Sequence, residues 1–488
     1  KQSLNKGYME YAQHKTESVR KLKRTSVAIK HAGGKYDPKP LHKIVAGLLT
    51  TTSDWAESST IDNIANNLSE NELKRLDMIC CVAAGTFVCD RGDKTISYCD
   101  KSKSLVYFLL KVLGKLQEIG TVPAIDYNAY AQKIKFDKTK SKTEFIDYVM
   151  SQMTLDDKVG QMVQYTYDGG DVTGSAIDKN YIKYTKQGMM GSVFNATTTD
   201  ITRKLQKIAV EETRLGIPLI FGYDVVHGYE TIFPIPLGEA ASWDLKAIEK
   251  SARVAATETA AGGVHWTFAP MVDIGYDPRW GRVSEGAGED TFLGSKIAVA
   301  RVNGFQGKSL YDLNTVLACT KHFAGYALAQ AGRDYGSVEI SDRYLRDYIL
   351  PPFKATVDAG AGSFMTSFNE IGGVPATASK YLYDQILRKE WGFKGFVVTD
   401  YPAKDLEEAT LKSVNSGIEM DMMSGAFLNH LAKLVKEGKV KQEVVDVAVR
   451  RILEAKYDLG LFEDPYRYSD SKREKETVMK KEFLDDAR

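Results

Sequence analysis

The sequence contains no apolar run long enough to cross a membrane. Its longest apolar stretch, residues 105–113, is interrupted by Lys111 and falls well short of the roughly 18 residues that a spanning helix needs. The chain also lacks a GxxxxGK loop, which would cradle phosphates, and an HExxH helix, which would bind zinc. These absences argue against a transmembrane helix, a P-loop enzyme and a metal hydrolase. We therefore expect no cofactor and no metal site.

Cysteine is scarce, with 5 residues in 488. Four of them (Cys80, Cys81, Cys89 and Cys99) lie close together and Cys319 stands alone, in spacings that match no zinc site. Buried free thiols are the interpretation that we favour. The chain starts at Lys1 and shows no signal-peptide pattern. Neither this start nor the cysteine usage predicts the cellular compartment of the protein.

Charge is distributed unevenly although the formal net charge is only +1. Residues 1–50 carry 11 Lys and Arg against 3 Asp and Glu, whereas residues 141–488 carry 42 against 49. The basic stretch 15–30 could meet phosphates or an anionic membrane, but no aromatic residues interleave with it. A solvated helix face is the simpler interpretation, and we expect no nucleic-acid binding by the rest of the chain.

Residues 1–140 have the pattern of a separate, mostly α-helical module. Ser69 and Glu72 form a capping-box pattern, and Leu73, Leu76 and Ile79 follow at helical spacing. These apolar stripes are typical of a helical core. The role of the module cannot be predicted from its residues, and a protein partner is one hypothesis.

Between residues 141 and 465, short apolar runs that end in polar residues alternate with helix-like segments. The eight runs are 159–165, 189–195, 219–226, 266–274, 316–323, 363–369, 395–401 and 418–423. Such alternation predicts parallel strands joined by crossover helices, and eight strands suggest a closed (β/α)₈ barrel similar to the TIM barrel. Residues 466–488 are charged and are expected to form a linker toward another domain.

The run that ends at Asp400 is central to the functional prediction. Val397 and Val398 indicate a strand buried on both faces, and Asp400 stands where that strand ends. In a parallel barrel, functional side chains project from the carboxyl ends of the strands. A helix-capping role for Asp400 is the alternative.

Other polar residues also fall at predicted strand ends. They are Asp224, His227, Asp273, Asp277, Arg282, Lys321, His322, Asn369 and Glu370. Each one alone could be a cap, a turn residue or a satisfied core histidine, but together they suit a polyhydroxylated neutral ligand, whose hydroxyls bond strongly to charged groups. Tyr223, Trp280 and Tyr401 are expected to offer aromatic faces for a sugar ring.

Five ordered motifs carry a resemblance to a known family. They are FGYDVVHG at 221–228, DPRWGR at 277–282, KHF at 321–323, GRDY at 332–335 and VVTDY at 397–401. In order and spacing they resemble the catalytic barrel of glycoside hydrolase family 3, in its bacterial periplasmic β-glucosidase branch, over about residues 143–488.

The resemblance implies a retaining exo-β-glucosidase that is either periplasmic or secreted. Its nucleophile is then Asp400, flanked by Tyr401. The residues implied to bind hydroxyls of the terminal sugar are Asp224, Arg282, Lys321 and His322. A retaining enzyme needs such a nucleophile and an acid about 5–5.5 Å from it.

The sequence departs from the family pattern in several places. The family usually takes its acid/base Glu from a C-terminal domain that we expect to lie outside this chain, and Glu285 and Glu289 are the alternatives within it. The interval between Asp400 and the 416–421 segment is shorter than the family pattern. Tyr326 stands where the N-acetylglucosaminidase branch has a His, which argues against amino-sugar substrates.

A second hypothesis of a different class is a carbohydrate-binding or scaffold protein. In that case the barrel keeps its sugar contacts but lacks an acid, and the helical module supplies partner binding. Turnover of an activated aryl glucoside separates the two, because a good leaving group needs little acid assistance.

Overall fold

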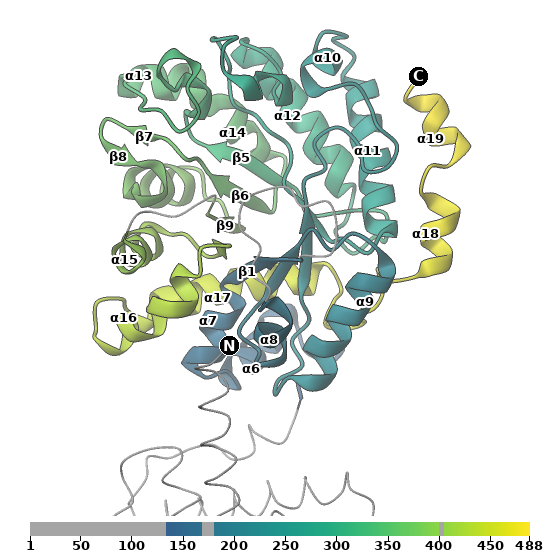
Figure 1. The fold of residues 1–488 in the computed structure, drawn as a ribbon, viewed down its shortest axis with the longest axis vertical. Coiled ribbons are helices and arrows are strands. Elements are labelled where there is room, and N and C mark those ends of the chain that lie inside the picture. Colours follow the sequence, from purple (N-terminus) through teal and green to yellow (C-terminus); the bar gives the residue numbers. More distant parts are fainter. Residues whose placement is uncertain (1–132, 168–179, 400–404) are drawn as a thin grey trace, which may run out of the picture. The chain divides into compact units, whose positions relative to one another are not determined.

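A computed structural model of the chain describes residues 133–167, 180–399 and 405–488 (Figure 1). The predicted helical module, as far as residue 132, lies outside the described residues. Eight short parallel strands overlap the eight predicted runs. They are β1 (Val163–Thr166), β2 (Ser192–Phe194), β3 (Ile220–Tyr223), β4 (Trp266–Thr267), β5 (Cys319–Phe323), β6 (Ser363–Thr366), β9 (Phe396–Val398) and β10 (Asp421–Met422).

The strands close into a barrel. One sheet has the order β10-β1-β2-β3-β4 and a second has the order β5-β6-β9, and all their pairings are parallel. Parallel bridges between Trp266 and Leu317 and between Met271 and Lys321 join β4 to β5. A bridge between Val398 and Met420 joins β9 to β10. The predicted (β/α)₈ barrel is therefore confirmed.

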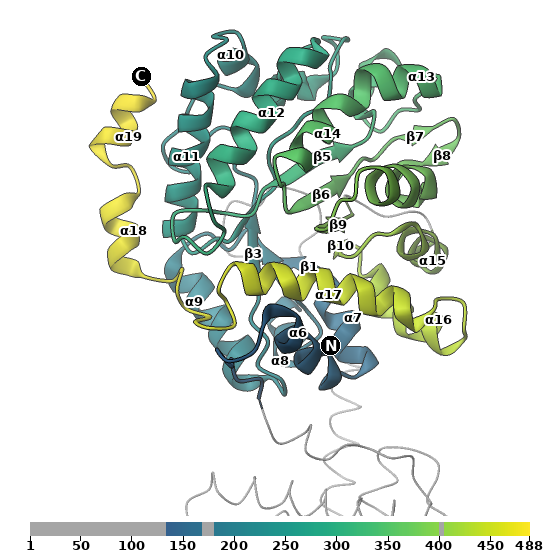
Figure 2. The same cartoon turned by 180° about the vertical axis from the view of Figure 1, so that it is seen from behind.

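Helices surround the strands on the outside of the barrel (Figures 1 and 2). Several begin at side-chain caps, such as Ser141 with Glu144 before α6 and Asp244 before α11, which satisfy the free N–H groups of the first turn. The barrel helices are α6 (Lys142–Ser151), α7 (Leu155–Gln161), α8 (Tyr181–Lys186), α9 (Thr199–Lys207), α10 (Pro236–Ala240), α11 (Leu245–Ala261), α12 (Thr291–Gln306), α13 (Asp342–Tyr344), α14 (Leu350–Asp358), α15 (Leu406–Ser416), α16 (Ala432–Lys436) and α17 (Gln442–Asp458), with a π-helical segment at Tyr381–Glu390.

Large side chains fill the inside of the barrel. The Trp266 ring packs edge-on against Phe268 and Phe396, at centroid distances of 4.8 and 5.0 Å. Its indole N–H donates to Ser363 Oγ on β6, 2.7 Å away. Gly222 on β3 lies against the Phe268 ring, where a Cβ would approach within 2.8 Å, so this ring leaves no space for a larger residue. The interior is thus a packed core, and a ligand has to bind at an end of the barrel.

Two features lie outside the predicted strand pattern. Residues after 465, which were expected to form a linker, contain α18 (Ser471–Thr477) and α19 (Lys481–Asp486), which lie along α11 in both views (Figures 1 and 2). Whether this segment leads to a further domain stays a prediction. A hairpin of β7 (Glu370–Ile371) and β8 (Val374–Pro375) follows β6. No helix within the described ranges is long and apolar enough to span a membrane.

Candidate active site

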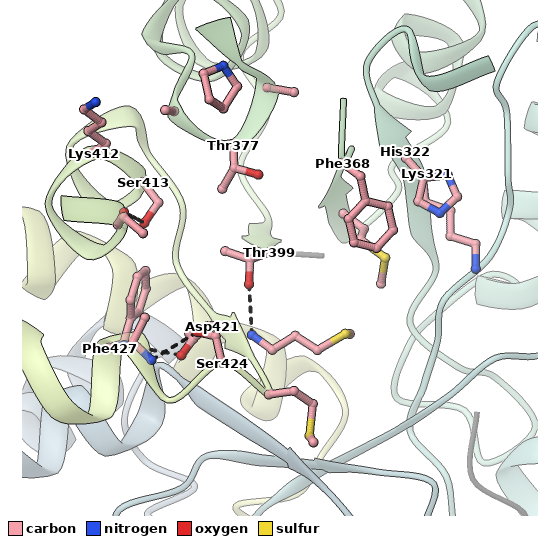
Figure 3. Close-up of a pocket in the computed structure, with 18 of the residues that line it drawn as sticks. Lys321, His322, Phe368, Thr377, Thr399, Lys412, Ser413, Asp421, Ser424 and Phe427 are labelled. Carbon is pink, nitrogen blue, oxygen red and sulfur yellow. Dashed lines mark hydrogen bonds between the residues drawn. The ribbon is translucent and has the colours of Figure 1, made fainter. Parts of the chain in front are cut away.

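A cavity of about 790 Å³ opens at the carboxyl ends of the strands. Four of the residues predicted to bind sugar line it: Asp224 after β3, Arg282 in the loop after β4, and Lys321 and His322 on β5. The sequence separates them by as much as 98 positions, and the parallel barrel brings them together. Figure 3 shows Lys321 and His322 beside Phe368 on one wall, with Thr377, Thr399 and the Asp421–Phe427 region on the other sides.

The remaining two predicted residues, Asp400 and Tyr401, lie outside the described residues. Thr399, which directly precedes Asp400 in the chain, lines the cavity. Its backbone N–H donates to Met420 O at 2.8 Å, and its hydroxyl accepts from the Met422 N–H at 3.0 Å. These bonds hold the end of β9 against β10 at the cavity.

Lys321 is the buried cation of the site. Its side chain is only 3% exposed, and its Nζ lies 2.7 Å from Asp224 Oδ1 and 4.0 Å from Glu285 Oε2. Burial lowers the pKa of Lys321, but the charges of Asp224 and Glu285 outweigh burial and hold that pKa above its ordinary value. Lys321 is therefore a fixed positive charge at the cavity wall.

Glu285 was an alternative for the catalytic acid, and its surroundings favour the ionised form. Arg282 donates two hydrogen bonds to this carboxylate, from Nε to Oε1 at 2.8 Å and from Nη2 to Oε2 at 3.1 Å. Burial raises the pKa of Glu285, but the Arg282 bonds and the Lys321 charge outweigh this and lower it overall. Such a carboxylate orients Arg282 and is a poor proton donor. Glu289, the other alternative, is exposed and is not among the described residues that line the cavity.

His322 is held in one orientation by Asp273. The Oδ2 atom of Asp273 lies 2.9 Å from the His322 backbone N and 2.9 Å from its Nδ1. Burial, followed by the charges of Arg282 and Lys321, lowers the pKa of His322 well below its usual value, so the imidazole is neutral. Burial also raises the pKa of Asp273 to about 7. When Asp273 is ionised, we assign the ring proton to Nδ1, which leaves Nε2 as a hydrogen-bond acceptor.

Of the three rings expected to face the sugar, Tyr401 lies outside the described residues, and neither Trp280 nor Tyr223 is among the described residues that line the cavity. Trp280, expected to face the sugar, is 1% exposed, and its indole N–H donates to Asp334 Oδ1 at 3.0 Å. It therefore ties the DPRWGR and GRDY motifs together and offers no open face. Tyr223 is half-buried and is not among the described lining residues. The aromatic rings that do line the described cavity include Tyr335, from the GRDY motif, and Phe368, neither of which was expected to face the sugar.

Carboxylates elsewhere on the described cavity wall are also engaged. Asp405 caps α15 through the N–H groups of Glu407 and Glu408, and Glu408 pairs with Lys412 at 2.6 Å. Asp421 is buried and accepts from the Ser424 hydroxyl and the Phe427 N–H. Each described carboxylate that lines the cavity thus has a hydrogen-bond or ionic partner. No group of three or more potential metal ligands occurs in the part of the chain that the structure describes.

The fold and this site define a (β/α)₈ barrel protein with an ionic cavity at the carboxyl ends of its strands. Residues 154–455 match the glycosyl hydrolase family 3 N-terminal domain. The chain belongs to glycosyl hydrolase family 3.

Several named proteins are similar to the chain. It is 40% identical to a periplasmic β-glucosidase of Salmonella typhimurium over 67% of its own length and 44% of the relative's. It is 35% identical to a lysosomal β-glucosidase of Dictyostelium discoideum, over 67% of its own length and 45% of that relative's length. The structure of a Listeria innocua β-glucosidase in complex with isofagomine has a TM-score of 0.67 and 38% identity, over 71% of this chain and 50% of that one. The chain thus spans about half the length of the relatives it matches.

Proposed function

We propose that this chain forms the sugar-binding and nucleophile-bearing part of a retaining exo-β-glucosidase. The observation that carries the proposal is the convergence of Asp224, Arg282, Lys321 and His322 on one cavity, beside the strand end that precedes Asp400. A small set of charged and neutral polar donors and acceptors around one end of a barrel suits a single terminal sugar.

The site groups divide the hydroxyls of that sugar by their chemistry. Asp224 accepts and Lys321 donates, so the pair binds two adjacent hydroxyls, and their charges strengthen both bonds. Arg282, oriented by Glu285, is a donor to a sugar hydroxyl. The Nε2 atom of His322 accepts from a hydroxyl. A neutral, polyhydroxylated ring satisfies all four, because it contributes both donors and acceptors.

In the proposed reaction, the Asp400 carboxylate attacks the anomeric carbon and the glycosidic bond breaks with its electron pair on the leaving oxygen. A proton donor is then needed for that oxygen, and water later hydrolyses the glycosyl ester. The described carboxylates at the cavity are all engaged, so we infer that the donor lies outside the described residues. Substrates with a good leaving group should react without it.

Glucose is the sugar that the relatives support best. The two relatives reported above are named β-glucosidases, and Listeria innocua β-glucosidase structures hold glucose or laminaribiose. The Salmonella relative is named periplasmic, which supports a periplasmic or secreted location for this protein, whereas the Dictyostelium relative is named lysosomal.

Hydrolysis of 2,4-dinitrophenyl β-D-glucoside tests the proposal. We expect turnover by the wild-type chain and a loss of at least about a thousandfold in Asp400→Asn, because the amide cannot act as a nucleophile. Asp384→Asn, which changes an exposed acid paired with Lys389, is the matched control and should keep wild-type activity. Glucose binding without turnover in the wild type would favour the carbohydrate-binding alternative. Equal turnover in wild type and Asp400→Asn would remove Asp400 from the mechanism.

A further inference from the structure

The chain that follows Asp224 folds back on itself in a short loop, residues 227–233, which we call the β3 loop. An antiparallel bridge between Gly228 and Ile232 closes this loop. The turn is tight, because a Cβ on Gly228 would lie only 2.1 Å from Thr231 O. The β3 loop is therefore a compact unit, joined through two residues to the aspartate that lines the cavity.

Glu258 on α11 holds the β3 loop from outside the cavity. Its side chain is fully buried, and both carboxylate oxygens bond to the loop. Oε2 accepts from the N–H groups of Glu230 and Thr231, at 3.1 and 2.8 Å, and Oε1 accepts from the Thr231 hydroxyl at 2.6 Å. Burial of a carboxylate is unfavourable unless hydrogen bonds replace its water, so these bonds strongly favour one position of the loop.

A fourth hydrogen bond to Glu258 comes from the segment between α18 and α19. The Met479 N–H donates to Glu258 Oε1 at 2.7 Å. Met479 has φ 54°, in the left-handed region that is unfavourable for a residue with a side chain. Such a conformation persists only where the surrounding structure fixes it, and it often marks a functional constraint. Here it accompanies a backbone N–H that bonds to a buried carboxylate.

The C-terminal segment, residues 470–486, is attached to the barrel on both sides of Met479. Before it, Arg473 on α18 donates to Leu313 O at 3.2 Å. After it, Asp486 on α19 pairs with Lys250 on α11 at 2.5 Å. Both helices lie along α11 in the two views (Figures 1 and 2). The placement of this segment therefore determines whether the Met479 N–H reaches Glu258.

We propose that Glu258 is a positioning residue that makes sugar binding depend on the C-terminal segment. This proposal rests on the proposed function for the role of Asp224 in sugar binding. When the segment is displaced, Oε1 of Glu258 loses one of its two donors, and the carboxylate shifts together with the β3 loop that is bonded to it. The shift reaches Asp224 and changes its contact with Lys321, which orients both groups toward the sugar.

Two substitutions at one position test the proposal in the full chain. Met479→Pro removes the N–H and cannot adopt φ 54°, whereas Met479→Gly keeps the N–H and adopts that angle readily. In Met479→Pro we expect amide hydrogen exchange in residues 224–235 to be at least about tenfold faster. Titration calorimetry should show glucose binding weakened about fivefold, the size of one hydrogen bond. Met479→Gly should match the wild type in both measurements.

Glu258→Gln is a second variant that decides the matter if Met479→Pro does not fold. Its amide oxygen can keep the bonds from Glu230 and Thr231 N–H, while its NH₂ group faces the Met479 N–H and cannot accept from it. We expect the same fivefold loss of glucose affinity, about the size of one hydrogen bond.

The outcomes separate this proposal from the proposed function. A purely structural role for Glu258 predicts a lower melting temperature with unchanged glucose affinity, and that result would overturn the proposal. Unchanged exchange in residues 224–235 of Met479→Pro would overturn it too, as would equal effects of Met479→Pro and Met479→Gly. If the wild type binds no glucose but the exchange difference between the two variants is found, the proposed function is contradicted and the link from Met479 to the β3 loop is supported.

Discussion

At the scale of single residues, the site depends on a cation that has been removed from water. Lys321 is almost completely buried, and Asp224 at 2.7 Å is its nearest counter-charge. Burial of an ammonium group is costly unless a partner compensates it, so removing one partner destabilises more than removing both. Under the proposed function, the pair links the stability of the barrel to the geometry of sugar binding.

The first prediction concerns this pair. Asp224→Ala should lower the free energy of unfolding by about 1–3 kcal/mol, because Lys321 is left buried with only Glu285 at 4.0 Å. The double variant Asp224→Ala/Lys321→Met should recover most of that loss, while glucose affinity stays low in both. Urea unfolding and calorimetric titration with glucose measure the two effects. If Asp224→Ala is as stable as the wild type, Asp224 does not offset the cost of burying the Lys321 charge.

The second prediction concerns the orientation of His322. Asp273→Ala removes the oxygen that fixes the ring proton on Nδ1, so the proton can move to Nε2. Nε2 then no longer accepts from a hydroxyl, and glucose affinity should fall about fivefold, the size of one hydrogen bond. Proton–nitrogen NMR of the His322 ring reports the tautomer directly. An unchanged tautomer together with unchanged affinity would contradict this role for Asp273.

The sequence predicts which residues meet at the site better than how they pair. Asp224, Lys321 and His322 could be anticipated because they fall at strand ends. The Asp273–His322 pairing could not, since it depends on the register that sets Met271 opposite Lys321 between β4 and β5. Trp280 was expected to face the sugar because aromatic residues do so in general, but tertiary packing buried it against Tyr326.

At the scale of elements, the eight strands were predictable because strands buried on both faces are continuous apolar runs. Their lengths were not, and β4 covers only Trp266–Thr267 of the predicted run 266–274. The β7–β8 hairpin was missed although Gly372 and Gly373, with φ values of 56° and 78°, are a strong two-residue turn signal. Its strands are too short for an alternating pattern to be visible.

The third prediction concerns α17, which carries a fully buried lysine. Lys456 Nζ donates to Gln161 Oε1 and to Gly191 O, and burial lowers its pKa to about 7. Between pH 7 and about 10.4, the unfolded chain binds this proton and the folded chain does not, so stability should rise with pH across that window. The rise, measured as the unfolding free energy of wild type minus that of Lys456→Met, should reach a few kcal/mol, on the order of 4. If the difference in unfolding free energy does not change with pH, Lys456 keeps its charge in the folded protein, which would contradict the prediction.

At the scale of the whole molecule, residues 133–488 form one compact unit. The described cavity residues and the barrel core all belong to it. The fourth prediction is therefore that a chain starting at Lys133 folds cooperatively and binds glucose with the affinity of the full chain. Thermal unfolding and calorimetry compare the two proteins. Loss of folding or of glucose affinity in the shorter chain would show that the barrel depends on residues 1–132.

The central claim is that the barrel carries a working nucleophile at Asp400. Incubation with 2,4-dinitrophenyl 2-deoxy-2-fluoro-β-D-glucoside tests it most directly, because the good leaving group needs little acid and the fluorine slows hydrolysis of the glycosyl ester. Intact mass and peptide mapping should find one added sugar, on Asp400, and none in Asp400→Asn. A folded, glucose-binding wild-type protein that acquires no adduct, or acquires it on another residue, would contradict the claim.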